Sequence, residues 1–99
     1  MSYVVINELF VDPESAQLFE KNFAASMMGT LGSVHGLASA RLLAPERPDR
    51  GYLSILEFAD RSDYERYLGS EEFRAAHNWP DHAPFQRSEL AEFVQIADL

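Results

Sequence analysis

The apolar residues of the chain recur at two periods, and each period predicts one type of element. Val, Ile, Tyr and Phe dominate residues 3–11, which predicts a strand that is apolar on both faces. An amphipathic helix ending at Gly29 is predicted next, because apolar residues recur at three- and four-residue steps: Ala16, Phe19, Phe23 and Met27. Residues 37–44 and 51–58 are predicted strands, joined by a polar connection that contains two prolines.

The second half of the chain repeats the order of helix and strand. A short helix is predicted to begin near Ser62 and to break at Gly69. Further helical turns carry Phe73 and His77, and residues 88–97 are predicted to form the last strand. The order βαββαβ is that of a ferredoxin-like α+β domain, an antiparallel sheet with both helices on one face. The whole chain, residues 1–99, is predicted to be a single domain.

The two faces of this predicted sheet differ in how they are covered. Both helices lie on one face, yet apolar side chains alternate onto the other: Val4, Ile6, Phe10, Leu53, Ile55 and Phe93. Soluble monomers rarely expose so large an apolar patch, and covering it would contribute on the order of several kcal/mol. We therefore expect a homodimer in which this face packs against a twofold-related copy. Glu8, Glu57 and Gln95 interrupt the face, so the covering surface is expected to tolerate some polar pairing.

Composition and charge exclude several classes of protein. A formal net charge of -8, with no basic patch, argues against nucleic-acid binding. The chain has no cysteine, which excludes disulfides, thiolate metal sites, iron–sulfur clusters and a nucleophilic thiol. Its longest apolar stretch is far shorter than the ~18 residues that span a bilayer, and the N-terminus lacks the features of a secretory signal. We expect a cytoplasmic protein that does not bind membranes.

Four residues predict a ligand pocket between helix and sheet. Phe73 and His77 lie on one side of the last helical turns, and Tyr67 lies ten residues before His77. Asn7 interrupts an apolar strand on its helix-facing side, where its amide must find a partner or face a cavity. An imidazole and an amide in an apolar pocket suit a flat aromatic ligand that needs one axial nitrogen.

Each of these residues also has a simpler interpretation. By spacing alone, His77 is favoured as an exposed histidine at a helix end, where the helix dipole stabilises its charge. Asn7 could equally bond a neighbouring loop, while Tyr67 and Phe73 could be core residues. The remaining histidines, His35 and His82, fall in loops and are interpreted as solvated.

Two stretches of the chain resemble the antibiotic biosynthesis monooxygenase family. One is Val5-Ile6-Asn7 in the first strand, followed by a helix that opens near Asp12-Pro13-Glu14. The other runs from Tyr67 to His77 and contains Ser-Glu-x-Phe-x-x-x-His, which is especially similar to the Isd-type heme-degrading branch. The resemblance covers roughly residues 3–96. It implies a ferredoxin-like domain whose sheets pair into a dimeric α/β barrel, in agreement with the burial argument.

The resemblance also implies roles for the four residues. A histidine at the end of this helix is the proximal iron ligand of the heme-degrading branch, and His77 matches it. The asparagine of the first strand forms hydrogen bonds in the distal pocket, and Asn7 matches it, while Phe73 is expected beside the cofactor. That branch carries a porphyrin-distorting tryptophan where this chain has Tyr67, which is smaller and bears a hydroxyl. Other branches are cofactor-independent oxygenases of polycyclic phenols or quinols.

Three functions therefore stay open at the level of sequence. The first is a monooxygenase that binds and oxidatively degrades heme, with His77 on the iron. The second is a monooxygenase without a cofactor, in which Asn7 and Tyr67 hydrogen-bond a phenol or quinol and His77 acts as a base. The third is a non-catalytic ligand-binding dimeric module, which predicts a pocket filled by side chains around Asn7 and His77. Heme is thus a possible cofactor, and the ligand is a small aromatic molecule or a tetrapyrrole.

Overall fold

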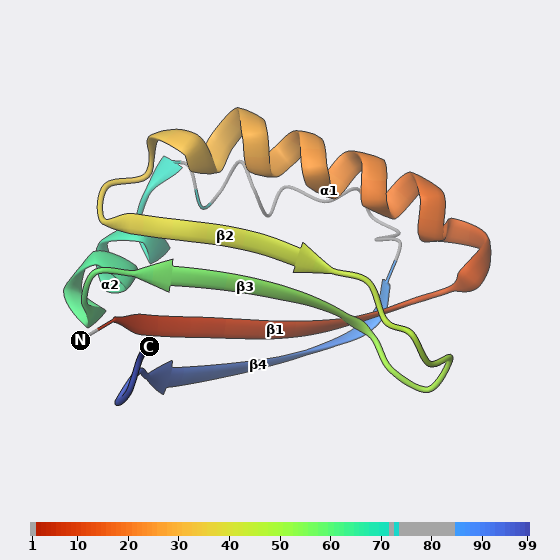
Figure 1. Ribbon diagram of the computed structural model, residues 1–99. Coiled ribbons are helices and arrows are strands. Elements are labelled where there is room, and N and C mark those ends of the chain that lie inside the picture. The colour runs from red at the N-terminus through yellow and green to blue at the C-terminus, as the bar shows by residue number, and fades with distance from the viewer. Residues whose placement is uncertain (1, 72, 74–84) are drawn as a thin grey trace.

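The computed structural model of the chain describes residues 2–71, 73 and 85–99 (Figure 1). Two short 3-10 turns, Pro13–Ser15 and Leu31–Ser33, flank the first helix. The predicted order βαββαβ is confirmed by the strands and α-helices: β1 Tyr3–Val11, α1 Ala16–Thr30, β2 Leu37–Leu43, β3 Tyr52–Phe58, α2 Arg61–Leu68 and β4 Phe85–Val94.

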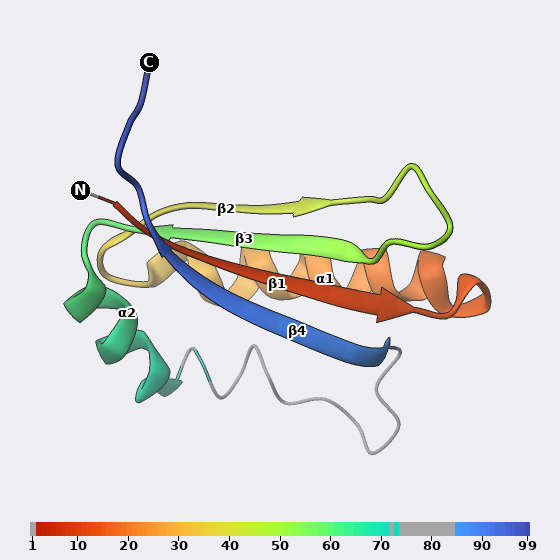
Figure 2. The same ribbon diagram turned by 90° about the horizontal axis from the view of Figure 1, so that it is seen from below.

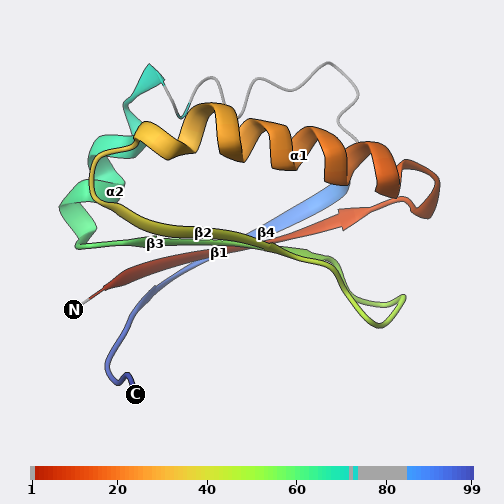
Figure 3. The ribbon, with the colours of Figure 1, turned by 45° about the horizontal axis from the view of Figure 1, so that its top comes forward.

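The four strands form one antiparallel sheet in the order β2-β3-β1-β4. Both helices lie on the same side of this sheet (Figure 3), and the other side carries no helix within the described residues (Figure 2). This is the predicted ferredoxin-like α+β architecture. No helix in the described part of the chain is both long and apolar enough to cross a bilayer.

The last strand lies three residues earlier than the predicted range 88–97. The reason is its register, because β4 runs antiparallel to β1 from the pair Val11 and Phe85 to the pair Tyr3 and Val94. Beyond Val94 the first strand has no residue left to pair with β4. A single further backbone hydrogen bond, from Gln95 N to Ser2 O at 2.9 Å, ends the contact between these two segments.

The helix starts also differ in detail from the prediction. The turn at Pro13–Ser15 is a 3-10 turn whose cap is the backbone carbonyl of Asp12, which accepts from Ser15 N at 2.9 Å, so α1 begins only at Ala16. The cap of α2 is Asp60, two residues before the predicted start near Ser62. Its carboxylate accepts from Asp63 N at 3.0 Å, which satisfies one of the free amides of the first turn.

A glycine fixes the loop before β2 against α2. Gly36 has a φ of +81°, a backbone conformation that favours glycine. A Cβ at this position would come within 2.2 Å of Asp63 Cγ, and Gly36 O accepts from Ala59 N at 2.8 Å. The loop therefore packs directly on the first turn of α2, which holds that helix at one end of the sheet.

The core between the helices and the sheet consists of two separate clusters. The larger one lies beside α2 and is built from Tyr3, Val5, Leu31, Phe58, Tyr64 and Tyr67. The smaller one lies under the first turns of α1 and is built from Leu9, Phe19 and Tyr52. Tilted ring contacts hold each cluster together, with Phe58 and Phe19 fully buried.

The opposite face of the sheet, called here the open face, has the apolar character that the sequence predicts. Its central residues are partly exposed within the single chain, and Phe93 is 50% exposed. Two acids of this face already have partners within the chain. Glu8 accepts from Gly51 N at 2.9 Å and pairs with Arg50 at 3.2 Å, and Glu57 accepts from Ser2 Oγ at 2.9 Å. A covering surface therefore needs no polar group for these two acids.

Candidate functional site

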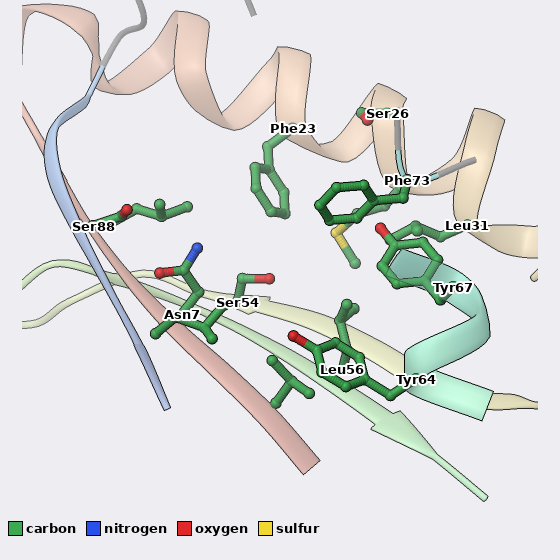
Figure 4. Close-up of a pocket in the computed structure, with 14 residues that line it drawn as sticks. Asn7, Phe23, Ser26, Leu31, Ser54, Leu56, Tyr64, Tyr67, Phe73 and Ser88 are labelled. Atoms are coloured by element: carbon green, nitrogen blue, oxygen red, sulfur yellow. The ribbon is translucent and has the colours of Figure 1, made fainter. Parts of the chain in front are cut away.

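A cavity of about 260 Å³ lies between the two core clusters, lined by residues of α1, α2 and the sheet and open to solvent on one side (Figure 4). Its floor carries Asn7 of β1 and Ser54 of β3. Phe23 and Met27 of α1 form the side opposite the floor, and Tyr67 of α2 stands at one end. The sequence packs both ends of the helix–sheet interface with aromatic rings and leaves small or polar side chains in the middle, which is why the middle stays hollow.

Asn7 brings an unsatisfied hydrogen-bonding group into this cavity. Strand alternation turns its side chain toward the helices, on the same face as Val5 and Leu9. Its Oδ1 is buried and has no hydrogen-bond partner among the described residues. A buried polar atom without a partner costs about 1–3 kcal/mol, so such an atom in a native fold calls for an explanation. A ligand that donates a hydrogen bond to Asn7 would provide one.

Two tyrosines from α2 form one end of the cavity. Tyr67 is 3% exposed, and its ring contacts Phe58 at a centroid distance of 5.6 Å and Phe73 edge-on at 5.3 Å. Tyr64 packs on Tyr3 and Phe58, and burial together with the negative Glu92 carboxylate raises the pKa of its hydroxyl. Tyr64 is therefore a neutral phenol at ordinary pH, able to donate a hydrogen bond.

The turn after α2 places a further aromatic ring on the cavity. Ser70 Oγ donates to Tyr67 O at 2.6 Å and accepts from Phe73 N at 3.1 Å. These two bonds connect the end of α2 to the residues that follow Gly69. Phe73 lines the cavity beside Tyr67 (Figure 4). The predicted iron ligand His77 and the loop histidine His82 lie outside the described residues.

The structure thus brings together three of the four residues predicted to form the pocket. Asn7, Tyr67 and Phe73 line one cavity, although a strand, a helix and the following turn supply them. Among the described residues the space beside Asn7 is open, whereas a non-catalytic module predicts a pocket filled around Asn7 and His77. The His77 part of that prediction lies outside the described residues. His35 has an exposed side chain, as its loop position suggested.

Four polar residues of the cavity, Ser26, Ser54, Tyr64 and Ser88, are not among the site residues predicted from the sequence. Ser54 is 9% exposed and lies directly across the β1–β3 ladder from Asn7. The sequence contains one indication that Ser54 belongs to the site, because it is a serine at a helix-facing position of a largely apolar strand. Its meaning depends on the register of β3 against β1, which the spacing of apolar residues does not give.

The lining of the cavity determines which ligands it suits. The lining residues that the structure describes are all uncharged, and their polar groups are amide and hydroxyl groups. No group of three metal-binding side chains occurs within the described part of the chain. These walls fit the flat apolar faces of an aromatic ring system, heme included, and the buried Asn7 oxygen supplies one fixed hydrogen-bond acceptor.

One protein-family model matches most of the chain. Residues 2–79 match the family model described as Antibiotic biosynthesis monooxygenase. The sequence has no significant match among curated proteins.

Several solved structures share the fold over nearly the whole chain. MhuD, described as a heme-degrader from Mycobacterium tuberculosis with two hemes bound in its active site, superposes with a TM-score of 0.81 at 18% identity, covering 98% of each chain. SnoaB, a cofactor-independent oxygenase from Streptomyces nogalater, gives 0.73 at 22% identity, covering 99% of this chain and 96% of SnoaB. A dabb family protein with a ferredoxin-like fold from Mesorhizobium loti gives 0.75 at 21% identity, covering 97% and 98%. At these identities the likeness establishes the fold.

Proposed function

The chain belongs to the antibiotic biosynthesis monooxygenase family, and we propose that it is a monooxygenase that binds a flat aromatic substrate in the cavity between the helices and the sheet. The buried, unpartnered Oδ1 of Asn7 carries this proposal. An unsatisfied acceptor at the floor of an uncharged, largely apolar cavity is typical of a binding site and would only destabilise a packed core.

The described lining favours a phenol or quinol that reacts with oxygen without a cofactor. The Asn7 amide offers an acceptor oxygen for a substrate hydroxyl and a donor nitrogen for an oxygen that has lost its proton. His77 is the proposed base that removes this proton. The resulting anion is electron-rich and gives electrons to O₂; one oxygen atom enters the product, and the other leaves as water with two substrate hydrogens. Exclusion of water by the aromatic walls strengthens the hydrogen bonds that hold the anion.

Heme is the second candidate, and the position of Phe73 favours it. Phe73 lines the cavity and lies four residues before His77, the residue that matches the family's iron ligand. His77 would hold the iron, Phe73 and Tyr67 would pack on the porphyrin, and Asn7 would offer hydrogen bonds on the distal side. Bound heme would supply the activation of O₂, while the protein supplies the ligand, the orientation and a dry pocket.

Two measurements on the purified protein distinguish these candidates. Hemin titration should give a saturable Soret shift if heme binds, and the shift should be lost in His77→Ala but kept in His35→Ala, which removes an exposed histidine. Oxygen uptake with a panel of hydroquinones, without added metal, should be observed if the substrate itself activates O₂. Asn7→Ala should reduce this uptake by about tenfold or more, because it removes the proposed contact. A protein that shows neither response contradicts the proposed function.

We also propose that the protein forms a homodimer through the open face. This face combines partly exposed apolar residues with acids that are already paired within the chain. A second copy can therefore cover it without leaving a buried charge unpaired. Ile55→Lys, in the centre of the face, should convert the dimer into a monomer in sedimentation equilibrium. Leu18→Lys, which replaces a 60% exposed residue on α1, is the matched control and should stay dimeric. A wild-type monomer at micromolar concentration would contradict this proposal.

A further inference from the structure

Ser54 and Ser88 are further polar residues on the sheet side of the cavity, and the proposed reaction does not use Ser54, which lies on the central strand β3. It occupies the middle of β3 between the apolar residues Leu53 and Ile55, and it is 9% exposed. Figure 4 shows its hydroxyl directed into the cavity and away from the Asn7 amide. Within the described residues its side chain has no recorded hydrogen-bond partner. The Asn7 oxygen is fully buried without a partner, whereas the Ser54 hydroxyl faces the cavity, where it can donate a hydrogen bond to a ligand or accept one.

The sheet fixes the spacing between these two polar groups. Asn7 and Ser54 are register partners across the antiparallel β1–β3 ladder. Directly opposed residues in such a ladder have Cβ atoms about 5 Å apart, on the same face of the sheet. Both side chains are short, and their strands lie at the centre of the four-stranded sheet, so neither group can move far from this arrangement. The two central strands therefore offer two hydrogen-bonding residues, Asn7 and Ser54, at a fixed, short separation.

We propose that Ser54 is a specificity-determining residue, and that the site selects aromatic ligands that carry two oxygen substituents on neighbouring ring carbons. One oxygen binds Asn7 and the other binds Ser54. This inference rests on the proposed function only in placing the aromatic ligand in this cavity. A ligand with one oxygen leaves either Asn7 or Ser54 without a hydrogen bond. The affinity lost through such an unpaired group exceeds the affinity that a matched ligand gains from the bond.

The surroundings of Ser54 determine which form of the ligand is preferred. Tyr64, Leu56 and Phe73 surround this part of the cavity, and no positive side chain occurs among its described lining residues. The nearby Glu92 carboxylate, which acts on Tyr64, adds negative potential at the same end. The resting site thus prefers a neutral diol to its anion or to a carboxylated analogue.

Anaerobic fluorescence titration with naphthalene probes tests this inference apart from turnover. The probes are 2,3-dihydroxynaphthalene, whose hydroxyls are adjacent, 2,6-dihydroxynaphthalene, whose hydroxyls lie at opposite ends, and 2-naphthol, which has one. We expect the wild-type protein to bind the adjacent diol most tightly. Ser54→Ala should weaken binding of that diol by about three- to tenfold and leave 2-naphthol nearly unchanged. Ser54→Thr, which keeps the hydroxyl, should restore the preference.

A matched control and two contrary outcomes complete the test. Ser39→Ala removes a serine from β2 of the same sheet at a position paired with Glu57, away from the cavity, and should change no affinity. Equal weakening of all three probes in Ser54→Ala, or no weakening, would overturn the role of Ser54 while leaving the cavity as the binding site. Failure of the wild-type protein to bind any probe, together with no hemin binding and no oxygen uptake, would instead overturn the proposed function itself.

Discussion

The ends and the middle of the helix–sheet interface are built on different principles. At the ends, aromatic rings pack in tilted contacts around Phe58 and Phe19, both of which are fully buried. In the middle, the register partners Asn7 and Ser54 face a cavity of about 260 Å³. One sheet therefore carries both a packed core and a hollow, polar site on the same face.

This difference shows how a small domain can keep a cavity. A chain of 99 residues has little core to spare, because small domains bury a smaller fraction of their surface. The two aromatic clusters clamp α1 and α2 to the sheet at both ends, so the middle need not contribute to stability. Substitutions at the ends should therefore cost stability, whereas substitutions in the middle should cost binding.

The largest effect is expected at a packed end. Phe58→Ala removes a fully buried ring that contacts both Tyr64 and Tyr67, and it should lower the free energy of unfolding by about 3–5 kcal/mol. Urea denaturation at fixed protein concentration measures this change. Leu18→Ala, on the exposed side of α1, is the control and should change stability by about 0.5 kcal/mol or less. A small loss of stability in Phe58→Ala would mean that the ends and the middle of the interface do not differ in their contribution to the free energy of unfolding.

In the middle of the helix–sheet interface, a substitution should raise the free energy of unfolding instead of lowering it. Asn7→Leu replaces an unsatisfied amide with an apolar side chain of similar size, and it should raise the free energy of unfolding by about 1–2 kcal/mol. The same variant should lose binding of hemin or of the naphthalene probes. Urea denaturation and ligand titration on one preparation give both quantities. A destabilised Asn7→Leu protein would show that the amide already serves the fold.

The smallest effect is a pH dependence at the other packed end. The Tyr52 hydroxyl donates to the Glu20 carboxylate, and this hydrogen bond, with burial, raises the pKa of Tyr52 from 10.0 to about 12. Because the folded pKa lies above the unfolded one, the stabilisation is complete below pH 10 and is lost as the pH rises toward 12. Tyr52→Phe should cost about 1 kcal/mol below that window.

Unfolding of both proteins by urea across this alkaline range checks the expectation. The difference in stability between the wild-type protein and Tyr52→Phe should shrink as the pH rises. Glu20→Gln keeps an acceptor but removes the charge, so the difference should begin to shrink at lower pH in that background. A difference that stays constant up to pH 12 would contradict the assignment of the raised pKa to this contact.

Local patterns in the sequence determined the elements and their order. Period-two and helical spacing of apolar residues gave β1, α1, β2, β3 and α2 to within a few residues, because side-chain direction follows directly from backbone geometry. The same alternation placed Asn7 on the helix-facing side and the apolar set on the open face. The first and last strands differ in this respect: the limits of β1 were predicted as observed, whereas β4 is limited by the residues of β1 that it can pair with.

Tertiary structure alone decided which groups share the site. The register of β1 against β3 makes Ser54 the neighbour of Asn7, and a shift of one residue would turn Ser54 to the open face. Intrachain partners likewise satisfy Glu8 and Glu57 on the open face. Each of these outcomes depends on contacts between residues distant in the chain, and the spacing of residues along one segment carries no information about such contacts.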